Sequence, residues 1–302
     1  MNMNRLFAIL GLLLLALISW YFLIKPSDYN VYFNVSTSSG HAYDELLNWD
    51  SVTEAADETT VSSQFPYREL TQQLSVNKTT YNIEWNLSRL NDSTTRVKAG
   101  ISEPGHKIVN RILIPFTDTE FENTTLNLVM DYKKFLEESI SQFNIEVTGT
   151  ETTPSKFCAC TRAKTTPENK AFKMMRDYSY LSGFIASNGL EADGNPVVDI
   201  LEFQEEKRLI EFDFCFPFKK QDSLPESPDI FFKQIEARPA IKAIYNGDYR
   251  FSNKSWYHIF DYAEDQDIPY LKQPLEVYYN NPNMGGNTLE WVTDIYLPID
   301  PS

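Results

Sequence analysis

The residues best suited to chemistry lie in a short segment near the C-terminus. In Glu276-Val277-Tyr278 the acid and the phenol are two positions apart, so in an extended strand they point to the same side. A carboxylate among aromatic rings can bind a cation by charge pairing and by cation–π contacts, each worth about 0.5–2 kcal/mol. The same pair could serve as general base and hydrogen-bond donor in a hydrolase. A solvated acid on an exposed strand is a third interpretation.

Metal and cofactor chemistry is not expected from this sequence. The histidines lie far apart, and none occurs in an H-E-x-x-H or H-x-x-x-H spacing, so we predict no metal and no cofactor. The three cysteines are too few for a disulfide framework or a four-ligand metal site, and we expect them to be small apolar side chains in strands. The residues concerned are His41, His106, His258, Cys158, Cys160 and Cys215.

The composition is that of an ordered, acidic chain. At 302 residues, with 42% hydrophobic and 14% aromatic residues, the chain can form two domains with separate cores. The formal net charge of −15 opposes binding to a phosphate backbone, because nucleic-acid affinity comes largely from clustered Lys and Arg. The sequence shows no helix-turn-helix pattern either. We therefore expect no nucleic-acid partner.

The N-terminus carries one long apolar run. Leu6–Ile24 contains no charge, and its 19 residues are close to the roughly 20 that span a bilayer. A cleaved signal peptide is the alternative, but the run ends in large aromatic and aliphatic residues rather than in a small-residue cleavage pattern. We predict a single-pass membrane anchor over residues 1–25. The charges at Arg5 and Lys25 favour weakly an N-terminus inside the cytoplasm and a body outside it.

Residues 26–150 are predicted to form the first domain behind this anchor. Hydrophobic residues alternate in three segments, which predicts strands over Tyr29–Ser36, Tyr81–Leu87 and Lys107–Pro115. Apolar residues at spacings of three and four predict a short helix over Ala42–Trp49 and a long one over Leu126–Phe143. The order of elements places a C-terminal amphipathic helix against an antiparallel sheet.

This order resembles the START-like (SRPBCC, polyketide-cyclase-like) domains over about residues 28–146. The best local match is Tyr81-x-Ile83-x-Trp85-x-Leu87 followed by Asp92-Ser-Thr-Thr-Arg-Val97, which is similar to the hairpin of central strands in that family. The resemblance implies a long helix on a curved antiparallel sheet, with an apolar cavity between them. A filled structural core is the alternative, and no residue here is assigned a ligand role.

Residues 151–302 are predicted to form a second domain that contains a tandem repeat. The polar stretch Thr148–Ser155 suits a linker. After it, a strand, a helix and two strands follow one another twice, and Asp213-Phe-Cys-Phe-Pro217 recurs 81 residues later as Asp294-Ile-Tyr-Leu-Pro298. Two such units side by side leave a cleft at their pseudo-twofold junction. The expected fold is therefore an α+β protein with an N-terminal transmembrane helix, a START-like domain and a tandem βαββ domain.

The second repeat resembles the GyrI-like family of small-molecule-binding domains over about residues 155–300. Three ordered strings carry the resemblance, namely Tyr245-Asn-Gly-Asp-Tyr249, Leu275-Glu-Val-Tyr-Tyr-Asn-Asn-Pro-Asn283 and Glu290-Trp-Val-Thr-Asp-Ile-Tyr-Leu-Pro-Ile299. The family includes the ligand-binding half of multidrug-sensing transcription regulators and also stand-alone proteins, some of them hydrolases. The resemblance implies an aromatic site that binds cationic or amphipathic molecules through an acidic residue.

Carried over by position, the acidic residue of that site is Glu276, with Tyr278 on the same strand face. Asp294 matches a second acidic position that is usually Glu in the family, and its side chain is shorter than that of Glu. The expected aromatic walls of the site are Tyr245, Tyr249, Trp256 and Tyr296.

The leading function is a membrane-anchored protein that receives or sequesters a small amphipathic or cationic molecule in the GyrI-like cleft. Its partners are then that molecule and, through the N-terminal helix, the membrane. The alternative is a hydrolase of small reactive electrophiles, with Glu276 as general base and Tyr278 or Tyr296 as donor. A structural envelope protein, with a filled cleft and an exposed apolar patch, is the third reading.

Overall fold

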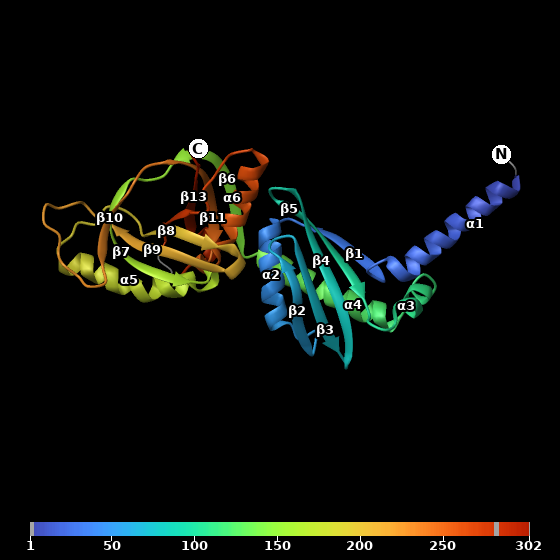
Figure 1. The fold of residues 1–302 in the computed structure, drawn as a ribbon. Helices are drawn as coiled ribbons and strands as arrows, with labels where there is room; N and C mark the ends of the chain where they lie inside the picture. Colours follow the sequence, from blue (N-terminus) through green and yellow to red (C-terminus); the bar gives the residue numbers. More distant parts are fainter. Residues whose placement is uncertain (1–2, 281–283, 302) are drawn as a thin grey trace. The chain divides into compact units, whose positions relative to one another are not determined.

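The computed structural model describes residues 3–280 and 284–301, which form two compact units of α+β architecture (Figure 1). Unit 1 comprises the described residues up to Val35 with Ala42–Arg89 and Thr95–Glu137, and unit 2 comprises Ser36–His41, Leu90–Thr94 and the described residues from Glu138 onward. Each unit is built on one antiparallel sheet. Each is described here by itself.

Unit 1 has a five-stranded sheet covered on one face by helices. The strand order is β1-β5-β4-β3-β2. The elements are β1 (Tyr29–Val35), α2 (Ser39–Val52), β2 (Glu58–Phe65), β3 (Glu69–Val76), β4 (Thr79–Asn91), β5 (Thr94–Ser102), α3 (Lys107–Leu113) and α4 (Glu120–Ile140).

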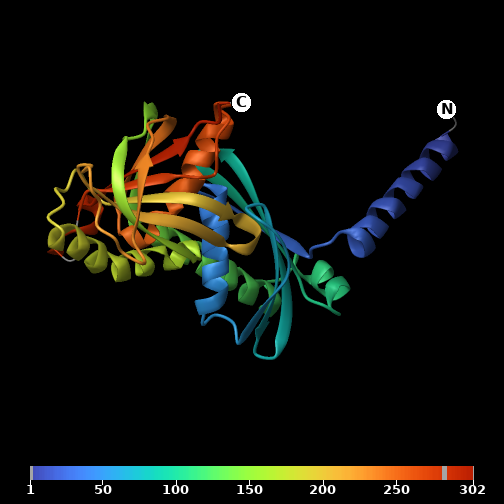
Figure 2. The same cartoon turned by 60° about the vertical axis from the view of Figure 1, so that its left-hand side comes forward.

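Three large aromatic side chains hold the helices of unit 1 to the sheet. Figure 2 shows the helix α2 beside the sheet of unit 1. Trp85 of β4 packs edge-on against Trp49 of α2 and Tyr132 of α4, with ring centroids 6.3 and 4.9 Å apart, and all three are buried. Each such aromatic pair contributes roughly 0.5–1.5 kcal/mol beyond the burial of its area. The alternation along β4, which buries Tyr81, Ile83, Trp85 and Leu87, is the pattern expected from the sequence.

The N-terminal segment departs from the sequence-based expectation. The helix α1 runs over Met3–Ser19 and gives way to a π-helical turn over Trp20–Ile24. Among residues 3–280 and 284–301, no helix is both long enough and apolar enough to cross a membrane. The predicted transmembrane helix over Leu6–Ile24 is therefore wrong, and the membrane as a partner stays a prediction.

The segment Lys107–Pro115 is also not the strand that its alternation predicts, because residues 107–113 form the helix α3. A buried arginine explains its position. The guanidinium of Arg111 donates to Asp28 at 2.9 Å and to the carbonyl oxygens of Tyr21 and Lys25, both at 2.5 Å. These carbonyls lie at the end of the N-terminal helical segment, where backbone acceptors lack helical partners. Arg111 thus ties α3 to that segment.

Unit 2 has an eight-stranded antiparallel sheet in the order β10-β7-β9-β8-β12-β13-β11-β6. Its strands are β6 (Phe143–Thr152), β7 (Lys156–Thr165), β8 (Val197–Gln204), β9 (Leu209–Pro217), β10 (Phe231–Ile235), β11 (Pro239–Gly247), β12 (Leu275–Tyr278) and β13 (Val292–Pro298). The three strands β7, β9 and β8 of the first repeat mirror β11, β13 and β12 of the second about the central β8–β12 pair. This strand order agrees with the expected tandem repeat.

Two helices cover the same face of this sheet, and we call that face the covered face. In the first repeat α5 (Lys170–Ser187) packs on β7 and β9, and in the second α6 (Lys254–Asp265) packs on β11 and β13 (Figure 1). Side chains from both helices, Lys170 and Trp256, bond to Glu276 of β12. The other side of the sheet is called the opposite face below.

The predicted linker Thr148–Ser155 is mostly part of a strand. Residues 143–152 form β6, which pairs with β11. The paired residues run from Phe143 opposite Gly247 to Thr152 opposite Pro239. The segment looked like a linker because β6 is an edge strand whose side chains are all at least partly exposed, so polar residues are tolerated on both of its sides.

Candidate functional site

Glu276 lies on the covered face with its carboxylate out of contact with solvent. Oε1 accepts a hydrogen bond from the indole Nε1 of Trp256 at 2.8 Å. Oε2 accepts from the Lys170 ammonium, from the Tyr278 hydroxyl and, at 3.5 Å, from Ser252 Oγ. A carboxylate leaves water only where such donors replace its hydration. Four side chains from three elements and one loop therefore hold this acid in place.

Lys170 is the countercharge of Glu276 within the chain. Both side chains are 0% exposed, and Nζ also donates to Ser252 Oγ at 2.9 Å. Burial lowers the pKa of Lys170 below the usual range of lysine, against the attraction of Glu276. The Tyr278 hydroxyl stands beside the same carboxylate, and burial followed by that negative charge raises its pKa well above 10. The phenol therefore stays protonated and donates to the carboxylate.

A cavity of about 310 Å³ lies next to this network in unit 2. The described residues that line it are Ala171, Met174, Met175, Tyr178, Ser179, Pro196, Phe214, Asp248, Tyr249, Arg250, Tyr278, Asn280 and Trp291. Most of these side chains are apolar or aromatic, which is typical of sites for small organic molecules, whose volumes run from about 300 to 1,000 Å³. Glu276 does not line the cavity, so Tyr278 separates the acid from this space.

The helix α5 and the strand ends explain why the cavity has this lining. Ala171, Met174, Met175 and Tyr178 recur at helical spacing and turn one stripe of α5 toward the cavity. From the other side, the ring of Tyr249 meets that of Tyr278 edge-on with centroids 4.7 Å apart. Wide rings face flexible methionines across the cavity, and thioether side chains adapt easily to ligands of different shape.

The cavity carries one acid and one base among its described lining residues, and these pair with each other. The guanidinium of Arg250 donates to Asp248 Oδ2 at 2.7 and 2.9 Å, and its backbone N–H donates to Oδ1 at 2.9 Å. Burial alone would raise the pKa of Asp248, but the bonds from Arg250 outweigh it and hold that pKa below its usual range. Asp248 is therefore ionised and already neutralised.

The other predicted site residues lie in the Glu276 network, in or near the cavity lining, or on the opposite face of the sheet. Trp256 bonds Glu276, and Tyr249 and Tyr278 line the cavity. Tyr245 is buried on the covered face, where its hydroxyl donates to the Asp248 carbonyl at 2.9 Å, and it does not line the described cavity.

Asp294 and Tyr296 lie on the opposite face, away from Glu276. In the β12–β13 register Glu276 pairs with Ile295, and Val277 pairs with Asp294. Directly paired residues share a face, so Asp294 and Tyr296 cannot act on the same ligand atom as Glu276. Asp294 instead accepts from Tyr279 at 2.9 Å and pairs with Lys242 at 3.1 Å. Burial lowers the pKa of Lys242, but Asp294 outweighs this and raises it above the usual range.

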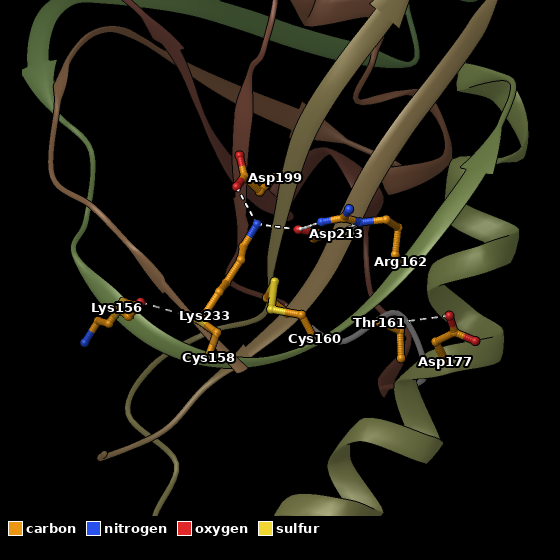
Figure 3. Close-up of a disulfide and its surroundings, with 10 residues drawn as sticks. Lys156, Cys158, Cys160, Thr161, Arg162, Asp177, Asp199, Asp213 and Lys233 are labelled. Atoms are coloured by element: carbon orange, nitrogen blue, oxygen red, sulfur yellow. Dashed lines mark hydrogen bonds and ion pairs between the residues drawn. A yellow bond between two sulfur atoms is a disulfide. The ribbon is translucent and has the colours of Figure 1, made fainter. Parts of the chain in front are cut away.

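The opposite face also carries a disulfide and a second buried acid (Figure 3). Cys160 of β7 and Cys215 of β9 are register partners and form the disulfide, while Cys158 is a buried thiol. Two of the three cysteines are thus joined rather than being separate apolar side chains as predicted. Next to them Asp213 accepts from Arg162 at 2.8 Å and from Lys233 at 2.5 Å, and Lys233 also pairs with Asp199 at 2.7 Å.

Sequence reasoning missed Lys170, which is the main partner of Glu276, and most of the cavity lining. The stripe on α5 was available as a helical periodicity, but such a stripe indicates burial without distinguishing a core from a cavity. For Lys170 there was no sequence signal, because 106 residues separate it from Glu276. Nothing in the sequence indicated that Asp248 and Arg250 would form an ion pair in the cavity lining.

Comparison with known proteins finds a family match within unit 2. Residues 160–300 match the family described as the GyrI-like small-molecule-binding domain. The resemblance of the second domain to this family is therefore confirmed, whereas the START-like assignment of residues 26–150 stays a prediction. No curated protein matches the chain significantly.

Several solved structures are similar in fold. The C-terminal domain of EcmrR is 17% identical with a TM-score of 0.43, covering 53% of this chain and 99% of that one. SAV2435 bound to tetraphenylphosphonium is 13% identical with a TM-score of 0.36, covering 52% and 94%. A hydrolase from Listeria innocua encoded by lin2189 is 10% identical with a TM-score of 0.34, covering 56% and 98%.

The prediction that nucleic acid is excluded as a partner is wrong. Another similar structure is that of EcmrR in a complex with DNA, at 15% identity and a TM-score of 0.43, covering 65% of this chain and 76% of that one. The exclusion rested on the missing helix-turn-helix pattern and on the net charge of −15, which is a property of the whole chain and does not describe a local surface.

Proposed function

We propose that this protein binds a small amphipathic molecule in the cavity of unit 2 and acts as a receptor for it or sequesters it. The observation that carries this proposal is the cavity of about 310 Å³, lined by methionine, tyrosine, phenylalanine and tryptophan side chains. The match of residues 160–300 to a small-molecule-binding family supports the same function.

The lining favours an aromatic or branched apolar body with one polar end. Rings of Tyr178, Tyr249 and Trp291 offer faces and edges for stacking, and burying apolar area contributes about 25 cal/mol per Å². The Asn280 amide and the Ser179 hydroxyl can bond a polar group of the ligand. Such a small number of polar groups orients a ligand without demanding a particular charge.

The hydrolase reading has less support from the geometry. A general base must reach the water that it activates. Glu276 does not line the cavity, and Lys170, Trp256 and Tyr278 already occupy both of its oxygens. The hypothesis of a structural envelope protein predicts a filled cleft, and the cavity in unit 2 disagrees with that prediction.

The location of the body outside the cytoplasm is also part of this proposal. The Cys160–Cys215 disulfide supports it, because disulfides persist in oxidising compartments and are rare in the cytosol. Mass spectrometry after alkylation of the protein in intact cells would test it. Alkylation of Cys160 and Cys215 without prior reduction would contradict it.

Binding can be tested with two variants of α5. Ala171 lines the cavity and Phe172, its neighbour, is 63% exposed, so Ala171→Trp fills the cavity while Phe172→Trp adds a similar ring outside it. We expect Nile red to bind the full chain, Ala171→Trp to weaken binding about tenfold or more, and Phe172→Trp to leave it unchanged. Fluorescence titration measures all three. Equal binding by the two variants would place the ligand elsewhere.

A further inference from the structure

The contacts around Lys170 are those that an aromatic acid site would offer to an organic cation. The ammonium bonds the Glu276 carboxylate and the Ser252 hydroxyl, and it lies 4.7 Å from the centroid of the Trp256 ring. The Lys170 ammonium thus occupies the carboxylate, the hydroxyl acceptor and the ring face that such a cation would use. The lysine is the first residue of α5, and its backbone position lets the side chain reach inward beneath the cavity.

Lys170 neutralises the negative charge of Glu276, and the described lining of the cavity offers no other unpaired negative charge. Asp248 and Arg250 are the charged residues among the described lining, and they are bonded to each other. Next to the cavity, Glu276 and Lys170 form a second pair, and this one is fully buried. A ligand in this space therefore meets no unpaired charge among the described lining residues, while rings and thioethers make up most of the wall.

We propose that Lys170 stands in for a cationic ligand at Glu276, so that the cavity selects uncharged aromatic molecules over cations of the same shape. This inference rests on the proposed function and concerns the same cavity. A cation would lose its hydration on entering and would find no unpaired carboxylate to replace it.

Displacement of Lys170 by an incoming cation is the competing route, and it is costly. Separating a buried ion pair leaves an uncompensated charge inside the protein, which would lower the affinity of the displacing ligand by about a hundredfold or more. The lysine would also lose its bond to Ser252 at 2.9 Å. An uncharged ligand needs no such rearrangement.

Two matched compounds test the proposal on the full-length protein. Triphenylphosphine oxide and methyltriphenylphosphonium share three phenyl rings on phosphorus, and only the second is charged. We expect calorimetric titration to show that the oxide binds wild type about tenfold or more tightly than the phosphonium. Equal affinities, or a preference for the phosphonium, would overturn the proposal.

Lys170→Met sharpens the test because it removes the ammonium and keeps an apolar chain of similar length. We expect its affinity for the phosphonium to rise about tenfold or more, while its affinity for the oxide stays within about threefold. Lys233→Met, which makes the same change to a lysine of the opposite face, is the control and should change neither affinity. A folded Lys170→Met protein that binds the oxide normally but gains nothing for the phosphonium would contradict the proposal.

A second variant decides the question if Lys170→Met does not fold. The pair Lys170→Gln and Glu276→Gln removes both charges together, and we expect it to keep the preference for the oxide. A switch to the phosphonium in this double variant would overturn the proposal. If wild type binds neither compound while Nile red binds in the Ala171-dependent way, the proposed function stands and this choice of ligand class fails. If Nile red also fails to bind, the proposed function fails.

Discussion

The covered and the opposite face of the unit 2 sheet each hold a buried acid, and the two acids differ in how they are paired. Glu276 and Asp213 are both 0% exposed. The cation on Glu276 is equally buried, whereas the cations on Asp213 reach solvent, with Arg162 52% and Lys233 21% exposed. The ion pair of Glu276 is therefore fully buried beside the cavity, whereas the ion pairs of Asp213 are partly exposed to water on the opposite face.

Ion pairs on the two faces differ in how far water can replace the partner of each charge. On the opposite face, water screens the cations, and their long side chains can follow a change in the acid. On the covered face neither partner can reach water, so each depends on the other for solvation. Burial thus makes Lys170 a fixed part of the site next to the cavity, and it makes Lys233 an adjustable surface group.

The largest expected effect comes from removing the acid on each face. Glu276→Gln leaves Lys170 buried without its countercharge, and we expect a loss of about 3–5 kcal/mol in the free energy of unfolding. Asp213→Asn leaves cations that can turn to solvent, so we expect a loss of about 1–2 kcal/mol. Urea unfolding of the full chain measures both. Similar losses for the two variants would break the comparison.

The disulfide of the opposite face should give the next largest effect. It closes a loop of 55 residues, and such a crosslink contributes roughly 2–4 kcal/mol, chiefly by restricting the unfolded chain. We expect Cys160→Ser to lower the denaturation midpoint clearly and Cys158→Ser, the neighbouring buried thiol, to lower it less. Reduction of wild type should reproduce the first change. No response to a reductant would show that the disulfide does not support this face.

Acid should also destabilise unit 2 through His258 of α6, whose ring contacts Thr37 at 3.2 Å. Burial, with a smaller contribution from His41, lowers the pKa of His258 from 6.5 to about 3. The unfolded chain therefore binds the proton first, and stability is lost as the pH falls from about 6.5 toward 3, by at most about 1.4 kcal/mol per pH unit. His258→Gln should make this loss shallower in urea unfolding across that range. His106→Gln, whose side chain is exposed, should not.

The smallest effect should come from Lys233 on the opposite face. Its ion pairs with Asp199 and Asp213 are partly exposed, so we expect Lys233→Met to cost about 0.2–1 kcal/mol and the cost to shrink in high salt. Unfolding at low and high ionic strength measures this. A larger loss that does not depend on salt would mean that the two faces pair their acids in the same way.

The sequence predicted the elements of unit 2 better than their contacts. Strand alternation and the repeated Asp-x-x-x-Pro endings located the paired halves, because local pattern and spacing determine them. Alternation failed at α3, where the long-range bonds of Arg111 outweigh a weak local preference. Hydropathy failed at the N-terminus, since an uncharged run does not show where its helix ends.

The candidate site was predictable only in part, for a related reason. Glu276 and Tyr278 are neighbours on one strand, so their shared face follows from the period of two. Whether Asp294 shares that face depends on the register of β12 against β13, and a shift of one residue reverses the answer. Lys170 lies on a different repeat, and only the folded sheet brings it to the acid.

The two strands outside the repeats determine how the sheet ends. Without β10 and β6, the paired halves would stop at β7 and β11, whose free N–H and C=O groups could accept a strand from another molecule. β6 covers β11 and presents the exposed acid Glu146 on its edge, where like charges keep copies apart. A fragment trimmed to start at Lys156 would uncover β11. The segment that looks like a connector thus protects the repeats against edge-to-edge aggregation.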